Sequence, residues 1–190
     1  AGLGPSGTRA SAFNLDVARA LAGMLEAAGA EVVLTRQGDA SVSEVARVQV
    51  SEAFRADRYL RIGHAAAPPL AGHYFASAGG RRWGGLVADA MLALGLADSL
   101  PVREASKYAL TQASAAALYA SLARIDDPLS EARLLAPGGL RAEAFALFLA
   151  LARDFAPSDD WEPDSIEVRD EGGRPIPGAL VTLGGALVLQ

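Results

Sequence analysis

The stretch that decides the fold is FNLDVARALAGMLEAAGAEVVLTR, residues 13–36. Its apolar residues recur every three or four positions, as on one face of an amphipathic helix: Phe13, Val17, Leu21, Met24 and Leu25. Gly29 stands where a helix commonly ends. Residues 30–36, AEVVLTR, are short and β-branched and predict a buried strand. A helix that leads directly into a buried strand indicates an α/β domain.

The same alternation continues along the chain. The pattern predicts further helices over 43–55, 81–96, 129–135 and 139–155. It predicts further strands over 58–64, 72–77, 107–112 and 116–122. Strands that alternate with helices predict a three-layer α/β fold, with a mostly parallel or mixed sheet flanked by helices.

The composition changes after Phe155. Residues 157–164 are rich in proline and aspartate and predict a linker. Residues 165–190 alternate β-branched residues with glycine and proline turns, which predicts a short C-terminal β segment. We therefore divide the chain into an α/β domain over 1–156, a linker over 157–164 and a β segment over 165–190.

Charge and composition exclude several classes of partner. The formal net charge is −5 and no block of lysine or arginine occurs, which argues against nucleic acid or an anionic membrane surface as the main partner. The chain has no uninterrupted apolar run of about 18 residues, and its first residues lack the pattern of a signal peptide. Because cysteine is absent, a metal site would need histidine, aspartate and glutamate, and His64 and His73 are the two histidines.

His64 is the first candidate for a functional residue. It ends the predicted strand RYLRIGH, in which Leu60, Ile62 and His64 share one face while Arg61 points to the other. Small residues and two prolines follow it. A histidine at a strand end can be a metal ligand, a catalytic base or a packed core residue, and the residues around it leave all three open.

Three stretches carry a resemblance to a known family: residues 4–39, 46–67 and 122–135. Their order and spacing resemble the zinc-dependent N-acetylmuramoyl-L-alanine amidases of bacterial cell walls, over roughly residues 4–155. The resemblance implies a mixed sheet between helices and a zinc ion held by two histidines and a glutamate. It implies a second glutamate as the catalytic base and cleavage of the amide between the lactyl group of N-acetylmuramic acid and L-alanine.

The family's functional residues carry over one at a time. His64 matches the second zinc histidine, whereas the first lies in a glycine-rich turn ahead of the residues printed here. The zinc-binding glutamate stands four residues before the asparagine that matches Asn14, which is Ala10 in this chain. The catalytic glutamate stands six residues before the position of Asp127, which is Ser121. The resemblance therefore predicts a degenerate zinc site, with His64 as the retained ligand, no catalytic residue and zinc absent or weakly bound.

Three functions follow from this pattern. The first is a pseudoenzyme of the cell envelope, periplasmic or extracellular, that binds or regulates peptidoglycan. The second is an active amidase, through compensating ligands such as His73 and Glu104 or a shifted alignment. The third is a scaffold that pairs with another cell-wall protein or with itself through the C-terminal β segment. Residues 168–183 resemble the start of a carboxypeptidase-regulatory-like or immunoglobulin-like β module.

Other polar residues have structural explanations. Asp126 and Asp127 precede a predicted helix and are expected to cap it, because an acidic side chain accepts hydrogen bonds from the first backbone N–H groups. Arg47 lies within a predicted helix and is expected to form a structural ion pair.

Overall fold

The computed structural model describes residues 2–157, 168–176, 181–183 and 187–189. The helices are α1 (Ala10–Ala27), α2 (Glu44–Phe54), α3 (Ala78–Ala93), α4 (Tyr108–Gln112), α5 (Pro128–Leu135) and α6 (Gly139–Phe155). The strands are β1 (Arg58–Ala65), β2 (Leu70–His73), β3 (Val102–Glu104), β4 (Ala116–Arg124), β5 (Val181–Leu183) and β6 (Leu187–Leu189).

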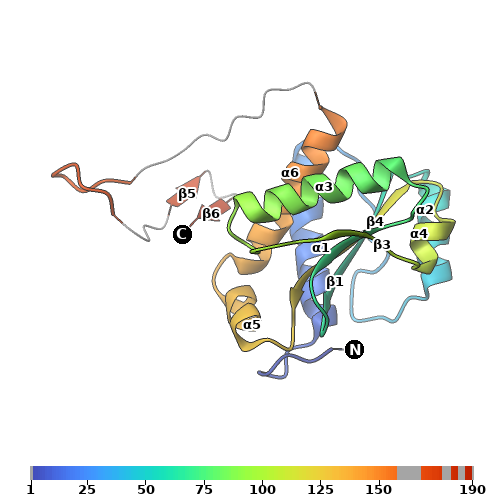
Figure 1. Cartoon of the computed structure of the whole chain (residues 1–190), viewed down its shortest axis with the longest axis horizontal. Coiled ribbons are helices and arrows are strands. Elements are labelled where there is room, and N and C mark those ends of the chain that lie inside the picture. Colours follow the sequence, from blue (N-terminus) through green and yellow to red (C-terminus); the bar gives the residue numbers. More distant parts are fainter. Residues whose placement is uncertain (1, 158–167, 177–180, 184–186, 190) are drawn as a thin grey trace.

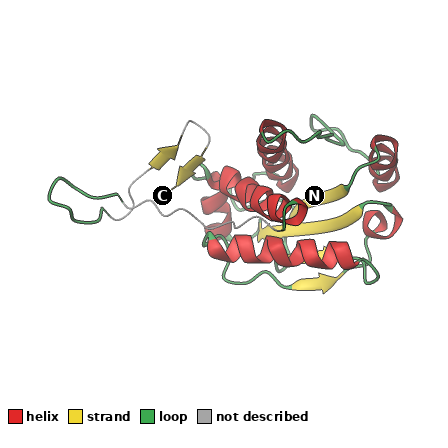
Figure 2. Cartoon of the chain, turned by 90° about the horizontal axis from the view of Figure 1, so that it is seen from above, coloured by secondary structure: helices red, strands yellow, loops and turns green. Residues whose placement is uncertain are grey.

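The main sheet is mixed and lies between two layers of helices (Figures 1 and 2). Its strand order is β1-β4-β2-β3. β1 runs parallel to β4, β4 runs antiparallel to β2, and β2 runs parallel to β3. Helices α1, α3 and α6 pack on one face, and α2 and α4 pack on the other. This arrangement confirms the predicted three-layer α/β fold with a mixed sheet.

The main core fills the space between the sheet and the first of these helix layers. It joins Trp83 of α3, Leu118 of β4 and Leu147 of α6, each fully buried. Two smaller apolar clusters complete the interior. One lies under α2 and α4, and the other lies where α1 and α5 meet the end of β4.

Three helix ends follow the sequence signals. Gly29 takes a positive φ of 88° directly after α1, as expected of a glycine that ends a helix. The side chain of Ser43 accepts a hydrogen bond from the backbone N–H of Ala46 and caps α2. The side chain of Asp127 accepts one from Ser130 and caps α5, which confirms the capping prediction for this residue.

The strand predicted over residues 30–36 is wrong. These residues form no β-ladder in the part of the chain that the structure describes, where β1 pairs with β4 alone. A β-branched run becomes a strand only when a neighbouring strand accepts and donates its backbone hydrogen bonds. Residues 33–36 instead lie across a cavity from β1, with no strand beside them.

Two further elements differ from the prediction. Residues 107–112 were predicted as a strand, but Tyr108–Gln112 form the short helix α4, and the strand β3 lies just before it. Short apolar runs do not distinguish a helix from a strand, and here burial of Ala109 and Leu110 against β4 decides for the helix. The strand predicted over 72–77 ends at His73, because Ser77 already caps α3.

The C-terminal β segment is described in part. β5 and β6 pair antiparallel, and Arg169 forms an isolated bridge with Pro175. Residues 158–164 of the predicted linker lie outside the described residues. Among the described helices, none is by itself long and apolar enough to cross a membrane, and α5 and α6 reach that length and composition only as a pair bent by 87°.

Candidate functional site

His64 lies near the end of β1, where the strand pairing is irregular. Gly63 stands opposite Ser121 of β4, but His64 stands opposite Ala123, so the register shifts by one residue between them. Such a bulge changes the direction in which a side chain points. The imidazole of His64 enters the space between α1 and α6 and is 2% exposed.

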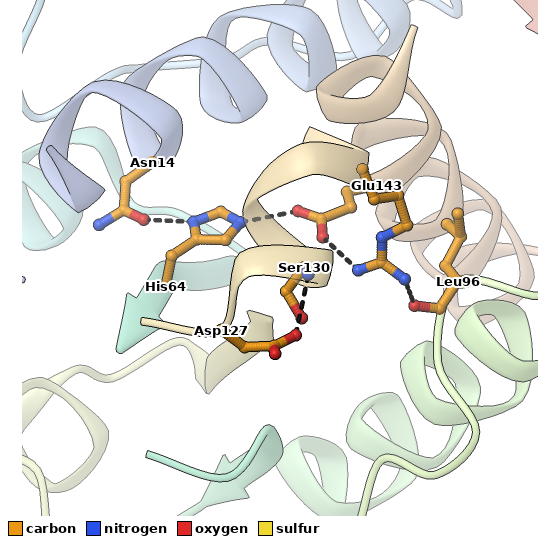
Figure 3. Close-up of polar contacts among 7 residues, drawn as sticks. Asn14, His64, Leu96, Asp127, Ser130 and Glu143 are labelled. Carbon is orange, nitrogen blue, oxygen red and sulfur yellow. Dashed lines mark hydrogen bonds and ion pairs between the residues drawn. The ribbon is translucent and has the colours of Figure 1, made fainter. Parts of the chain in front are cut away.

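Both ring nitrogens of His64 have partners (Figure 3). Nδ1 lies 2.7 Å from Oδ1 of Asn14 on α1, and Nε2 lies 2.8 Å from Oε2 of Glu143 on α6. Both partner atoms are oxygens, and the tautomer of the imidazole decides which ring nitrogen donates. The ring of Phe13 meets the imidazole edge-on, with 5.9 Å between ring centroids. The imidazole is therefore fixed on two sides by hydrogen bonds and on a third by an aromatic ring.

The carboxylate of Glu143 continues this network. Its other oxygen, Oε1, lies 3.4 Å from an Nη atom of Arg133 on α5. The guanidinium of Arg133 also donates to the carbonyl of Leu96. Glu143 is fully buried and Arg133 is about one third exposed. The carboxyl group of Glu143 is thus enclosed between the imidazole and a guanidinium, as a buried polar group requires.

Sequence reasoning missed Glu143. The signal was available in α6, where Glu143 occupies the same helical stripe as the buried residues Leu147, Ala150 and Leu151. A glutamate in the middle of an apolar stripe is almost never buried without a partner, so its position predicts a buried cation or donor facing it. The sequence alone does not say that this partner is His64, because 79 residues separate the two.

The structure brings the three family positions together at one end of the sheet. Ala10 and His64 line the same cavity, and Ser121 pairs with Gly63, the residue before His64. Ser121 is buried, and its hydroxyl has no hydrogen-bond partner among the described residues. Ala10 and Ser121 therefore both lie near His64 in the fold. Neither residue can supply a carboxylate.

His73 and Glu104 lie elsewhere in the sheet. His73 stands opposite Leu118 of β4, whereas His64 stands opposite Ala123, five residues further on. That separation is roughly 16 Å along the strand. Nδ1 of His73 donates to the carbonyl of Tyr74, and Glu104 is exposed on β3, the strand at the opposite edge of the sheet from β1. The compensating ligands considered from the sequence do not converge on His64.

A cavity of about 560 Å³ borders the same end of α1 and β1. Asn14, His64, Tyr119 and three arginines are among the residues that line it. Two of these arginines, Arg36 and Arg47, hold residues 33–42, the segment that closes the cavity. Arg36 donates to the carbonyl of Ser11, and Arg47 donates to Thr35 Oγ1 at 2.6 Å and to the carbonyl of Val42 at 3.2 Å.

Arg47 therefore bonds neutral oxygens among the described residues, in place of the predicted ion pair. The third arginine, Arg61, does form one, with Glu44 at 2.7 Å, and its guanidinium stacks over the ring of Tyr119. Arg61 points away from the side of β1 on which His64 lies, as the alternation along the strand predicted. The cavity is consequently preformed, with its closing segment tied to α1 and α2.

The paired aspartates beyond β4 have structural roles. Asp127 caps α5, and its hydrogen bond with Ser130 lowers the pKa of its carboxyl. Asp126 pairs instead with Arg124, whose hydrogen bonds lower the pKa of that carboxyl. Only one of the two predicted caps is confirmed, because a single residue can occupy the N-cap position.

The comparisons with known proteins agree with this geometry. The model of the N-acetylmuramoyl-L-alanine amidase family matches residues 2–151, which is most of the chain. The chain belongs to this amidase family. Members of the family are cell-wall enzymes that act on peptidoglycan, and they are in general zinc-dependent. Among curated proteins, none matches the chain.

Solved amidase structures share the fold. The amidase AmiC2 of Nostoc punctiforme has a TM-score of 0.76 and 18% identity, over 82% of this chain and 89% of that one. The catalytic domain of CwlV from Bacillus (Paenibacillus) polymyxa var. colistinus has a TM-score of 0.74 and 16% identity, over 84% and 92%. CwlD from Clostridioides difficile, solved with the GerS lipoprotein, has a TM-score of 0.76 and 12% identity, over 83% and 92%.

The described residues of this amidase-family chain do not fit a zinc ion. A protein zinc site takes at least three nitrogen, sulfur or oxygen ligands around one point. In the described ranges, no group of three or more histidine, cysteine, aspartate or glutamate side chains is placed to hold a metal. Ala10 offers only a methyl group, and both nitrogens of His64 already face oxygen atoms.

Proposed function

We propose that this protein is a peptidoglycan-binding or regulatory pseudoenzyme with the amidase fold. One observation carries the proposal: the two positions at which the family has its glutamates are Ala10 and Ser121. In the reaction that the family resemblance implies, one glutamate binds the zinc and the other moves the proton, and a methyl group and a hydroxyl group do neither. Binding of peptidoglycan needs neither of these two glutamates.

The cavity beside His64 is the surface best suited to a ligand. It is concave, preformed and lined by amide, guanidinium and phenol groups, which fix the orientation of polar ligands such as glycans and peptides. In this proposal the cavity holds peptidoglycan or its fragments. The proposed location is the cell envelope, periplasmic or extracellular.

Retention on peptidoglycan tests the proposal. The purified chain is mixed with insoluble peptidoglycan, which is pelleted, and the supernatant is analysed for released muropeptides. We expect the chain in the pellet and no release. The cavity variant Arg61→Ala should bind less, whereas the matched control Arg103→Ala, at an exposed position of β3, should bind as the wild type does. If the wild-type chain stays in the supernatant when the peptidoglycan is pelleted, the binding role is contradicted.

An active amidase is the alternative that the same assay detects. Release of fragments whose new ends are the free lactyl group and the free amino group of L-alanine contradicts the pseudoenzyme. Zinc retained in near-stoichiometric amount after purification, and lost in His64→Ala, contradicts it equally. The scaffold alternative predicts an oligomer that dissociates when residues 162–190 are removed, which size-exclusion chromatography measures.

The division into domains also belongs to this proposal. We infer an α/β domain over residues 1–156, a linker over 157–164 and a β segment over 165–190. Pro157 follows the last turn of α6, where a chain leaves a helix. Limited proteolysis should cut first within 157–164 and leave a stable fragment that ends near residue 156.

A further inference from the structure

We propose that Asn14 and Glu143 occupy both ring nitrogens of His64, so that a buried polar network stabilises this fold without a metal. The network consists of Asn14, His64, Glu143 and Arg133 (Figure 3). The inference concerns the same site as the proposed function. It does not depend on peptidoglycan binding, since each test below is read on the ligand-free chain.

Protein atoms occupy both ring nitrogens of His64. An imidazole ligates a metal through the lone pair of a ring nitrogen that faces the ion. In this chain Nδ1 lies 2.7 Å from the amide oxygen of Asn14, and Nε2 lies 2.8 Å from a carboxyl oxygen of Glu143. A metal ion could reach either nitrogen only by displacing Asn14 or Glu143.

Burial and the charge of Arg133 both oppose a metal ion at this place. The side chains of His64 and Glu143 are fully buried, and the guanidinium of Arg133 lies 3.4 Å from the other carboxyl oxygen of Glu143. A divalent cation placed between His64 and Glu143 would stand close to this guanidinium, and the repulsion between the positive charges opposes its binding.

The network connects several elements of the fold. Asn14 lies on α1, His64 on β1, Glu143 on α6 and Arg133 on α5, and Arg133 also reaches the segment after α3 through the carbonyl of Leu96. Four side chains therefore join five parts of the domain at one end of the sheet. A zinc ion with three ligands performs this joining role in many proteins. Here hydrogen bonds and ion pairs perform it.

The wild-type chain gives the first test, which no folding defect can obscure. In ¹⁵N nuclear magnetic resonance spectra, a ring N–H proton of His64 should exchange slowly with water, because it is hydrogen-bonded and buried. Addition of excess zinc should leave the ring-nitrogen signals and the melting temperature unchanged. Ring-nitrogen signals that shift when zinc is added, or a melting temperature that zinc raises and a chelator lowers, would overturn the proposal.

A double-mutant cycle gives the second test. His64→Leu removes one of the two partners of the buried Glu143, and Glu143→Leu leaves the buried imidazole without its carboxyl partner. Each variant should lower the melting temperature by roughly 10 °C. The double variant replaces the pair by apolar residues of similar size. Its loss should be clearly smaller than the sum of the two single losses, because partners in one network are not additive. If the two losses in melting temperature are additive, His64 and Glu143 act independently, which would contradict the network.

A matched control separates this coupling from general damage to α6. Asp154 is a second buried carboxylate on α6, with Arg58 and Arg82 as its partners. It lies 11 residues from Glu143, or about 16 Å along the helix. Asp154→Asn combined with His64→Leu should give additive losses. If His64 were coupled to Asp154 as strongly as to Glu143, the coupling would reflect general destabilisation of α6. That result would contradict a specific interaction between Glu143 and His64.

Discussion

The ring of Tyr119 lies directly over Gly63, the residue before His64. A Cβ atom at position 63 would stand 2.8 Å from both Cε2 and the hydroxyl oxygen of Tyr119. The ring is itself flanked by two cations, Arg61 with 5.5 Å and Lys107 with 5.2 Å to its centroid. The absence of a side chain at Gly63 therefore allows β1 and β4 to approach where the register shifts.

A side chain at position 63 should destabilise the fold. Gly63→Ala forces the ring of Tyr119 away from its two cations, and we expect a loss of about 1–2 kcal/mol, the usual cost of overpacking. Urea unfolding measures it. Shortening the ring should relieve the strain, so Tyr119→Leu combined with Gly63→Ala should lose less than the two single variants together. If Gly63→Ala costs as much stability in the Tyr119→Leu background as in the wild type, the clash with the ring is not the cause.

The buried carboxylate of Asp154 should be the most sensitive acidic position outside the His64 network. It lies 2.6 Å from Nε of Arg58 and 2.6 Å from an Nη atom of Arg82. Asp154→Asn keeps the shape but removes the charge. It should cost about 2–3 kcal/mol, below the usual range for a fully buried pair because Arg82 is half exposed.

Chemical denaturation compares this loss with that of a surface pair. Arg9 and Asp39 are 3.2 Å apart and both largely exposed. Asp39→Asn should therefore change the free energy of unfolding by less than about 0.5 kcal/mol. A loss at Asp39 as large as the loss at Asp154 would contradict the argument from burial.

The sequence determined the layered architecture but not the edge of the sheet. The helical spacing from Phe13 to Leu25 and the strand ending in His64 are local patterns, and both appear as predicted. Residues 30–36 have the composition of a strand but no strand beside them, so pairing overrides composition. Residues 107–112 are too short a run for periodicity to choose between a helix and a strand.

The sequence likewise indicated some residues of the candidate site and missed others. The resemblance located His64, Ala10 and Ser121, and these positions do lie together at one end of the sheet. It could not indicate Glu143, because this residue lies outside the three stretches that carry the resemblance and its partner is distant in sequence. Only the packing of α6 against α1 brings the carboxyl group to the imidazole.

The N-terminal turn should depend on Glu131. This buried carboxylate accepts the backbone N–H of Ser6 at 2.9 Å and its hydroxyl at 2.6 Å. Glu131→Gln removes the charge that strengthens both bonds and should cost about 1–2 kcal/mol. Hydrogen exchange should become faster at residues 4–8. Ser6→Ala removes one of the two bonds and should have the smaller effect, and unchanged exchange in Glu131→Gln would contradict this role.

The cap of α5 should make stability depend on pH in the acid range. The hydrogen bond with Ser130 lowers the pKa of Asp127 in the folded chain, so the unfolded chain binds the proton more readily. Stability from this group is therefore fully present above the unfolded pKa of about 3.9, and it is lost as pH falls through the lower folded value. Asp127→Asn keeps a capping oxygen but removes the charge.

The wild type should accordingly melt a few degrees above Asp127→Asn at pH 6, and the difference should close as the pH falls from about 5 to below 3. Thermal unfolding followed by circular dichroism across that range measures it. Asp39→Asn is the matched control, because Asp39 is an exposed carboxylate that caps no helix. A difference between wild type and Asp127→Asn that stays constant down to pH 2.5 would show that the charge of Asp127 contributes nothing to the cap.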